Sequence, residues 1–219
     1  MRNWCFFIIS YNLFKSSENN SIFILTFNKR LQENIFDNLG IKMKSNKKET
    51  QTNYNILGHK IYDKRYKQEQ KIKYSIILNN VKFLTNEVIL DHGCGTGLFI
   101  ELIKNPVVGI DNSSGLLTGA LKKVKRKENK YLVHGDVDHL PFRDNIFQKL
   151  FSFTVIQNLE NPSDTLMEIL RVTKGLKIIT VLKKAYDKKD LICLIEKSRL
   201  ENTKIIDREE SKDWLLLIK

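Results

Sequence analysis

The sequence DHGCGTG at residues 91–97 directly follows the apolar run EVIL at residues 87–90. Three glycines at alternate positions after a strand indicate a turn whose backbone lies very close to a ligand. In an open α/β sheet, ligands bind beyond the carboxyl ends of the strands, which is where this turn falls. The first question that the sequence raises is therefore which ligand the turn holds.

The residues of the turn argue against the two common phosphate sites. A P-loop needs the pattern G-K-[ST], and the turn has no lysine to meet a phosphate. A dinucleotide site has the spacing G-x-G-x-x-G, whereas the spacing here is G-x-G-x-G and Asp91 lies two residues before the first glycine. A carboxylate at that position repels a pyrophosphate but suits a cation. S-adenosylmethionine, which carries an ammonium and a sulfonium and no phosphate, fits better than a nicotinamide dinucleotide does.

Two further acids follow the next two predicted strands. Asp111 ends the run VVGID at 107–111, and Asp136 lies in the segment HGDVDHLPF at 134–142. A carboxylate in the position of Asp111 can accept hydrogen bonds from both hydroxyls of a ribose, and Asp136 can accept one from the amine of adenine. A lone aspartate in a loop is more often a turn or cap residue. Three acids at three successive strand ends favour a nucleoside site.

From residue 87 onward, strand-like and helix-like segments alternate regularly. This alternation predicts an α/β fold with a doubly wound, mostly parallel seven-stranded sheet. The connection between the last two strands is too short for a helical crossover, so we expect the last strand to be antiparallel. In the helix at 161–175, Asn161 or Ser163 is the expected cap, Pro162 lies in the first turn and Gly175 is the expected end. The predicted strands are 87–90, 106–110, 131–134, 149–155, 176–182, 203–206 and 214–218, and the predicted helices are 97–104, 113–127, 161–175 and 187–200.

The chain divides into three predicted regions. Residues 87–219 form the ligand-binding domain, and residues 54–86 form an N-terminal helical cap. Residues 1–53 are an extension whose apolar runs at 4–9 and 21–27 fit poorly with the rest, so translation from Met43 is one hypothesis. The cap helix is expected over 54–80, with an apolar face of Ile61, Tyr62, Tyr66, Ile72, Ile76 and Ile77.

Composition limits the class of protein. Of the 219 residues, 42% are hydrophobic and 28% are charged, which is typical of a soluble globular protein. Three scattered cysteines without a C-x-x-C pair argue against a disulfide framework or a zinc site and suit the cytoplasm. The histidines have no ligand-like spacing, so we expect no metal. No apolar run is long enough to span a membrane.

The net charge of +12 makes nucleic acid a possible partner. The basic excess is densest at residues 58–87, where 7 basic side chains face 3 acidic ones. The sharpest cluster holds five lysines and one arginine between Lys122 and Lys130. This cluster is either a phosphate-contacting patch or the solvated end of a helix, where cations are favourable. We favour the helix end, because Tyr131 is the one aromatic neighbour.

The segments VILDHGCGTG, VVGIDNSSGLL, GDVDHLPFRDNIFQKLFSF and LMEILRVTKG together resemble the class I S-adenosylmethionine-dependent methyltransferases, in particular the type 11-like enzymes that methylate metabolites such as quinone precursors. The resemblance implies a Rossmann-like methyltransferase fold with S-adenosyl-L-methionine as the cofactor. It implies that Asp91 and the glycines hold the methionine end and that Asp111 binds the ribose. Asp136 and Val137 flank the adenine, with valine where the family usually has alanine. The implied cofactor-binding residues are Asp91, His92, Gly93, Cys94, Gly95, Gly97, Asp111, Asn112, Asp136 and Val137.

The methyl acceptor is expected to be a small molecule. The motif N/D-P-P-Y/F of enzymes that methylate amines of nucleic acids is missing, and Val155-Ile156-Gln157-Asn158 replaces the histidine-containing run often found after the fourth strand. The candidates for orienting the acceptor are Tyr62, Gln157 and Asn158, although Tyr62 could equally be a packing residue of the cap helix. The alternatives are an RNA methyltransferase and a non-catalytic methyltransferase-like partner subunit.

Overall fold

The computed structural model of the chain describes residues 24–26 and 45–219. The expectations about the apolar runs at 4–9 and 21–27 and about Met43 fall mainly or wholly outside these residues. Within them, one sheet has the strand order β1-β4-β3-β2-β5-β6-β8-β7. Its strands are β1 (Ile24–Thr26), β2 (Ile89–His92), β3 (Val107–Asp111), β4 (Lys130–His134), β5 (Phe147–Phe153), β6 (Thr173–Leu182), β7 (Thr203–Ile206) and β8 (Asp213–Ile218).

The seven strands predicted from the sequence are β2 to β8, and β1 adds a short parallel strand beside β4. Neighbouring strands from β4 through β6 are parallel, as the helical crossovers require. The last strand, β8, is antiparallel to both β6 and β7, between which it lies. The prediction of a mostly parallel, doubly wound sheet with an antiparallel last strand is therefore confirmed.

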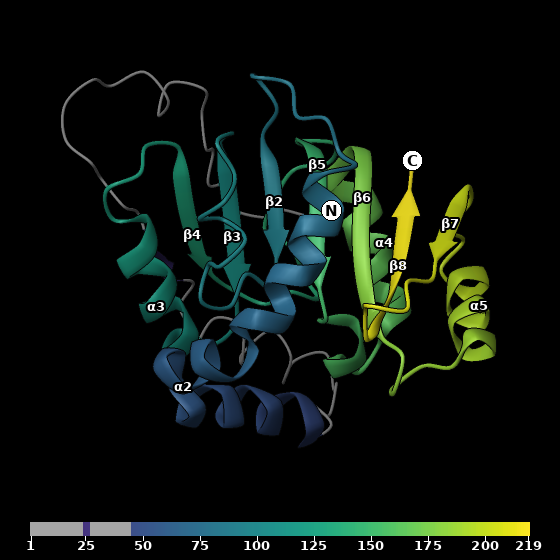
Figure 1. Ribbon diagram of the computed structural model, residues 1–219, viewed down its shortest axis with the longest axis horizontal. Helices are drawn as coiled ribbons and strands as arrows, with labels where there is room; N and C mark the ends of the chain where they lie inside the picture. Colours follow the sequence, from purple (N-terminus) through teal and green to yellow (C-terminus); the bar gives the residue numbers. More distant parts are fainter. Residues whose placement is uncertain (1–23, 27–44) are drawn as a thin grey trace, which may run out of the picture.

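Helices cover both faces of the sheet (Figure 1). On one face, α2 (Ser45–Leu78) and α3 (Ser114–Val124) pack over a core that includes Tyr74, Ile77 and Ala120. On the other, α4 (Pro162–Val172) and α5 (Lys188–Lys197) pack over a core that includes Leu166 and Leu191. Two of these helices have a side-chain cap: the Ser113 hydroxyl accepts from the N–H of Leu116, and the Asp187 carboxylate accepts from that of Asp190. At α4, Asn161 is the cap residue and Pro162 lies in the first turn, as predicted, but the Asn161 side chain makes no capping hydrogen bond.

The helix predicted at 97–104 is not an α-helix in the structure. The segment is a series of turns closed by isolated hydrogen bonds, such as that from the N–H of Gly97 to the carbonyl of Cys94. Phe99 and Ile100 are neighbours in sequence and are both fully buried. Successive residues on a helix point in different directions, so burial of all four residues from 97 to 100 favours turns over a helix with one apolar face.

Gly175 does not end a helix, contrary to the prediction. Helix α4 ends at Val172, and β6 begins at the next residue, so Gly175 lies inside the strand. The pairing of β5 with β6 shifts register between Phe147 and Lys149, opposite this glycine. A Cβ atom on Gly175 would lie 2.2 Å from the carbonyl oxygen of Gln148. The glycine is therefore needed for the close approach of two strands at an irregularity.

Helix α2 begins at Ser45, before the predicted start at residue 54, and it is interrupted at Gly58, which has φ 66° and ψ 163°. The predicted apolar face is wrong at two positions, because Ile61 is 57% exposed and Ile72 is 39% exposed. The residues that the helix buries include Gln70 and Lys73, which are 5% and 3% exposed. Lys73 faces inward because its ammonium donates to the Thr154 hydroxyl and pairs with Asp213.

Candidate functional site

The site lies at the carboxyl ends of β2, β3 and β5, which meet at one edge of the sheet (Figure 1). The turn after β2 crosses this edge, and the N-terminal arm of α2 lies beyond it. Two adjacent cavities occupy the space between them, and Tyr62, Gly93 and Phe153 line both. The strand ends and the cap helix therefore enclose the site together.

The three glycines of the turn all have positive φ, at 71° for Gly93, 52° for Gly95 and 74° for Gly97. A Cβ atom on Gly93 would lie 2.3 Å from a methyl carbon of Val155, and one on Gly97 would lie 3.1 Å from Ala120. Gly95 differs, because its nearest neighbours would be 3.8 Å away or more. Two glycines thus permit tight packing, and Gly95 presents bare backbone to the larger cavity.

The smaller cavity has a volume of about 10 Å³, which suits one group the size of a water molecule. Asp91 and Gln70 line it and are 2% and 5% exposed. One oxygen of each side chain, Oδ2 of Asp91 and Oε1 of Gln70, has no hydrogen-bond partner in the structure. Two buried acceptors without donors create a strong preference for a cationic donor such as a primary ammonium.

Burial raises the pKa of Asp91 well above its usual range, and the nearby Asp111 carboxylate raises it further. Without a bound cation, Asp91 therefore tends to keep its proton. A positively charged ligand favours the ionised form. The Cys94 thiol also lines this cavity, and burial raises its pKa, so it is not a reactive nucleophile.

Asp111 lies at the end of β3 and lines the larger cavity. Its Oδ2 accepts from the N–H of Gly95 at 2.8 Å, and its Oδ1 accepts from the N–H of Ser113 at 2.8 Å. Each oxygen can accept one further hydrogen bond, which leaves the carboxylate able to bind a diol. Burial nevertheless raises the pKa of Asp111. The larger cavity has a volume of about 70 Å³.

The structure separates the remaining predicted cofactor-binding residues. Asn112 and Val137 line the larger cavity, but Asp136 is not among the residues that line either one. The Asp136 carboxylate accepts from the N–H of Asp138 and contacts the ring of His139. His92 points into the core, where its Nδ1 lies 3.0 Å from the Ser152 hydroxyl and its Nε2 lies 2.8 Å from the carbonyl of Val137. His92 therefore supports the wall that Val137 forms.

Of the three predicted acceptor-side residues, Tyr62 and Asn158 line the larger cavity. Gln157 does not, and its amide donates to the carbonyl of Thr154, as does that of Asn158. Burial raises the pKa of Tyr62 far above its usual range. The Tyr62 phenol stays neutral and can donate a hydrogen bond, and the two amides do not titrate. None of the three side chains can remove a proton near neutral pH.

Gln70 and Thr154 each line one cavity and Phe153 lines both, and none of the three was expected at the site from the sequence. Gln70 comes from the cap helix, outside the matching segments, whereas Phe153 ends both the segment GDVDHLPFRDNIFQKLFSF and β5, with Thr154 directly after it. Among residues 24–26 and 45–219, no group of three or more histidines, cysteines or acids could hold a metal ion. No described helix is long and apolar enough to cross a membrane.

The methyltransferase domain family matches residues 90–179, which include the glycine turn and the carboxyl ends of β2, β3 and β5. This part of the chain matches a methyltransferase domain. S-adenosylmethionine is the cofactor of this type of domain, as the sequence predicts. The unpartnered acceptors of Asp91 and Gln70 fit the ammonium of that cofactor, and the free lone pairs of Asp111 fit its ribose.

The methyltransferase domain has relatives of known sequence and structure. An uncharacterized protein of Methanocaldococcus jannaschii is 34% identical over 169 residues, which cover 70% of this chain and 64% of that protein. A demethylmenaquinone methyltransferase of Staphylococcus saprophyticus is 33% identical over 122 residues, which cover 53% of this chain and 48% of that enzyme. The chain thus spans less than two thirds of either relative.

A solved structure from Methanococcus maripaludis, described as an S-adenosyl-L-methionine-dependent methyltransferase, superimposes with a TM-score of 0.61. The superposition covers 82% of this chain and 95% of the chain from Methanococcus maripaludis, at 19% sequence identity. At this level of identity, the likeness shows that the two chains share the fold of the methyltransferase domain.

Proposed function

We propose that the protein is an S-adenosylmethionine-dependent methyltransferase of the cytoplasm that transfers a methyl group to a small molecule. The observation that carries the proposal is the small cavity between β2 and α2, where Asp91 Oδ2 and Gln70 Oε1 both lack donors. An ammonium placed there would satisfy both acceptors and would compensate the charge of Asp91. From this cavity, the turn and Asp111 lead into the larger cavity.

The residues of the chain contribute binding and orientation rather than proton transfer. The cofactor, when bound, supplies an activated methyl group on a sulfonium. Tyr62 donates a hydrogen bond from a neutral phenol, and Asn158 offers an amide on the wall of the same cavity. Since none of these groups acts as a base near neutral pH, the site suits an acceptor atom that is already nucleophilic. Catalysis then rests mainly on positioning and on exclusion of water.

Two observations favour a small acceptor. Tyr54, Tyr62 and Leu159 are among the residues that line the larger cavity, and such aromatic and apolar side chains suit the body of a small molecule. One curated relative acts on demethylmenaquinone, according to its name.

Isothermal calorimetry tests the cofactor part of the proposal. S-adenosylmethionine and S-adenosylhomocysteine should bind, and NAD should not; absence of binding by both sulfur compounds would contradict the proposal. Radiolabelled methyl transfer into a cell extract tests the acceptor part. The label should appear in the small-molecule fraction.

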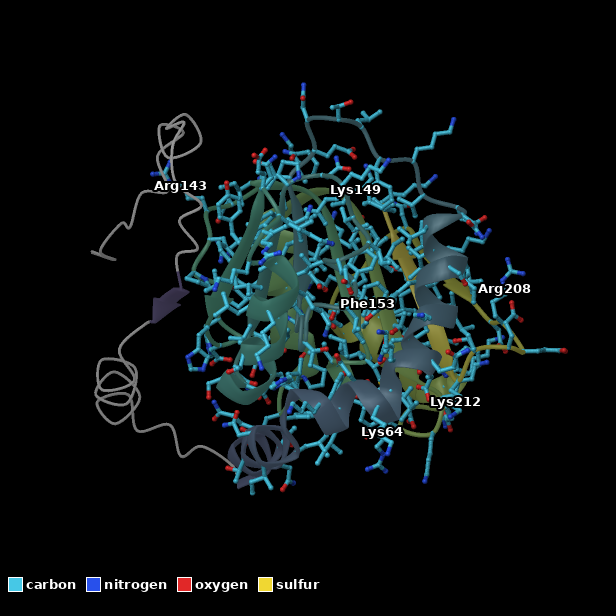
Figure 2. The ribbon with its side chains drawn as sticks, turned by 60° about the vertical axis from the view of Figure 1, so that its left-hand side comes forward. Lys64, Arg143, Lys149, Phe153, Arg208 and Lys212 are labelled. Atoms are coloured by element: carbon cyan, nitrogen blue, oxygen red, sulfur yellow. The ribbon has the colours of Figure 1, made fainter. Side chains whose placement is uncertain are left out.

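A specific surface feature favours the alternative of an RNA acceptor. On the part of α2 that follows Gly58, every charged residue with an exposed side chain is basic. Lys64 is one of them and points away from the molecule in Figure 2. Such a face can contact phosphates. If the methyl label appears in the RNA fraction and not among small molecules, this alternative replaces the first. The basic residues are Lys60, Lys64, Arg65, Lys67 and Lys71.

A further inference from the structure

Thr154, the first residue after β5, has φ 59°, in the left-handed region. A β-branched residue rarely adopts this conformation, because its Cβ substituents crowd the backbone. Such strain persists only where the surrounding contacts enforce it, and it is concentrated at functional sites. Thr154 lines the larger cavity, and Val155 after it packs against Gly93.

Every polar group of Thr154 has a partner. Its N–H donates to the carbonyl of Thr180 at 3.1 Å. Its hydroxyl accepts from the Lys73 ammonium at 2.8 Å and donates to Asp213 Oδ2 at 2.9 Å. Its carbonyl accepts from the side-chain amides of Gln157 and Asn158. The conformation of Thr154 therefore affects the orientation of both amides, of which that of Asn158 lines the larger cavity.

Lys73 and Asp213 form an ion pair with 2.6 Å between Nζ and Oδ2, and their side chains are 3% and 1% exposed. They come from α2 and from the first residue of β8. A buried ion pair contributes little net stability, because desolvation of both charges offsets their attraction. Stability alone is therefore a weak reason for placing this pair beside a strained residue of the site.

We propose that Lys73 is a positioning residue of the methyl-transfer site. Together with Asp213, it holds Thr154 in the left-handed conformation, and so it places Val155 and Asn158 as the wall that faces the glycine turn. The site to which this role belongs rests on the proposed function. The placement of the wall by the ion pair is a property of the chain itself and can be measured without an acceptor.

The test measures how removal of the ion pair changes the affinity for S-adenosylhomocysteine, first in the unaltered protein and then in a Thr154→Gly variant. Lys73→Met with Asp213→Asn removes both charges, and it should weaken S-adenosylhomocysteine binding about tenfold, the factor that corresponds to one residue no longer held in the left-handed region. Glycine adopts positive φ without help. In a Thr154→Gly background, the same two substitutions should therefore change the affinity less than about threefold.

Thr154→Val provides a second variant in case the double substitution does not fold. It leaves the ion pair intact and removes only the hydroxyl through which the pair holds the residue. Binding should again weaken about tenfold. Amide hydrogen exchange provides a readout without any ligand. Exchange at residues 154–159 should accelerate in the double variant and in Thr154→Val, but the double substitution should not accelerate it further in the Thr154→Gly background.

The Lys149–Glu87 ion pair is the matched control, because it too is largely buried. It lies toward the amino ends of β2 and β5, away from Phe153 and from Lys212, the neighbour of Asp213 (Figure 2). Lys149→Met with Glu87→Gln should leave the affinity for S-adenosylhomocysteine unchanged. If loss of the Lys73–Asp213 pair leaves both affinity and exchange unchanged, or if the loss is equally large in the Thr154→Gly background, Lys73 has no positioning role. Failure of the unaltered protein to bind S-adenosylhomocysteine would contradict the proposed function, and hydrogen exchange would still test the positioning.

Discussion

Gly93 and Val155 pack so closely that a Cβ atom on Gly93 would lie 2.3 Å from a Val155 methyl carbon. The glycine belongs to the turn after β2 and the valine to the segment after β5. The contact fixes the separation of the two walls of the larger cavity. Any atom added between them must push the walls apart or displace the turn.

Gly93→Ala should therefore weaken S-adenosylhomocysteine binding more than tenfold and lower the free energy of unfolding by about 1–3 kcal/mol. Two effects add, because alanine clashes with Val155 and is also strained at φ 71°. Calorimetry and urea denaturation measure them. A second substitution, Val155→Ala, should recover part of the stability by relieving the clash. Unchanged binding and stability in Gly93→Ala would show that the walls adjust freely.

Asp111→Asn should weaken S-adenosylhomocysteine binding roughly 10- to 100-fold, the range expected for lost hydrogen bonds to a charged acceptor. The amide can no longer accept from Gly95, Ser113 and a ribose at once, because one end of it is a donor. Asp164→Asn, on the exposed first turn of α4, is the control and should bind as the unaltered protein does. Full affinity in Asp111→Asn would remove Asp111 from the ligand site.

Ligand binding should release a proton from Asp91. Its pKa is raised from 3.8 by burial and by Asp111, whereas a bound ammonium favours the ionised carboxylate. Affinity for S-adenosylhomocysteine, which carries the same ammonium, should thus rise with pH until the pH passes the raised pKa. Calorimetry in two buffers of different ionisation enthalpy gives the number of protons released. The Asp91→Asn variant should bind the ligand more weakly and should release fewer protons. If both proteins release the same number, Asp91 is not the group that loses the proton.

The same carboxyl makes the stability of the empty protein depend on pH in the opposite sense. The folded state keeps the Asp91 proton at pH values where the unfolded chain has lost it, so unfolding releases a proton. The free energy of unfolding should therefore fall as the pH rises from near 3.8 through the raised pKa of Asp91. Urea denaturation across this range should show a smaller fall for Asp91→Asn. An equal fall would assign the effect to other groups, such as Asp111, whose pKa burial also raises.

Gly175→Ala should lower the free energy of unfolding by about 1–3 kcal/mol through overpacking against the backbone of β5. The affinity for S-adenosylhomocysteine should remain, because Gly175 lies near the amino end of β6, away from the ligand edge. Lys174→Ala, at the exposed neighbouring position, should have little effect on either quantity. A stable Gly175→Ala would mean that the irregular pairing can relax at no cost.

The sequence predicted the sheet well because most strands contain a short apolar run, which helices on the two faces of the sheet then bury. The run at 203–206 became β7 with the same bounds. The prediction of a helix at 97–104 was wrong, because the burial of Phe99 and Ile100 against other segments decides the conformation there. Gly175 was misread as a helix end because glycine serves equally where two strands approach closely.

The candidate site was predictable where its residues follow strand ends. Asp91, Gly95 and Asp111 come together for this reason. His92 points to the other side because alternate residues of a strand face opposite sides, and β2 extends through His92. Gln70 and Lys73 were not predictable, since polar side chains on a helix are ordinarily taken to face solvent. Only their contacts with distant segments explain their burial.

The contact between α2 and the start of β8 also affects the speed of folding. Glu69 of α2 forms an ion pair with Lys212, which precedes the first residue of β8, although 143 positions separate the two residues in the sequence. Contacts of such long range are slow to form, because the chain loses the entropy of a large loop before it gains the contact. We therefore expect the sheet to assemble before the cap helix docks. Protection from hydrogen exchange should then appear in β2 and β5 earlier than in the C-terminal half of α2 during refolding.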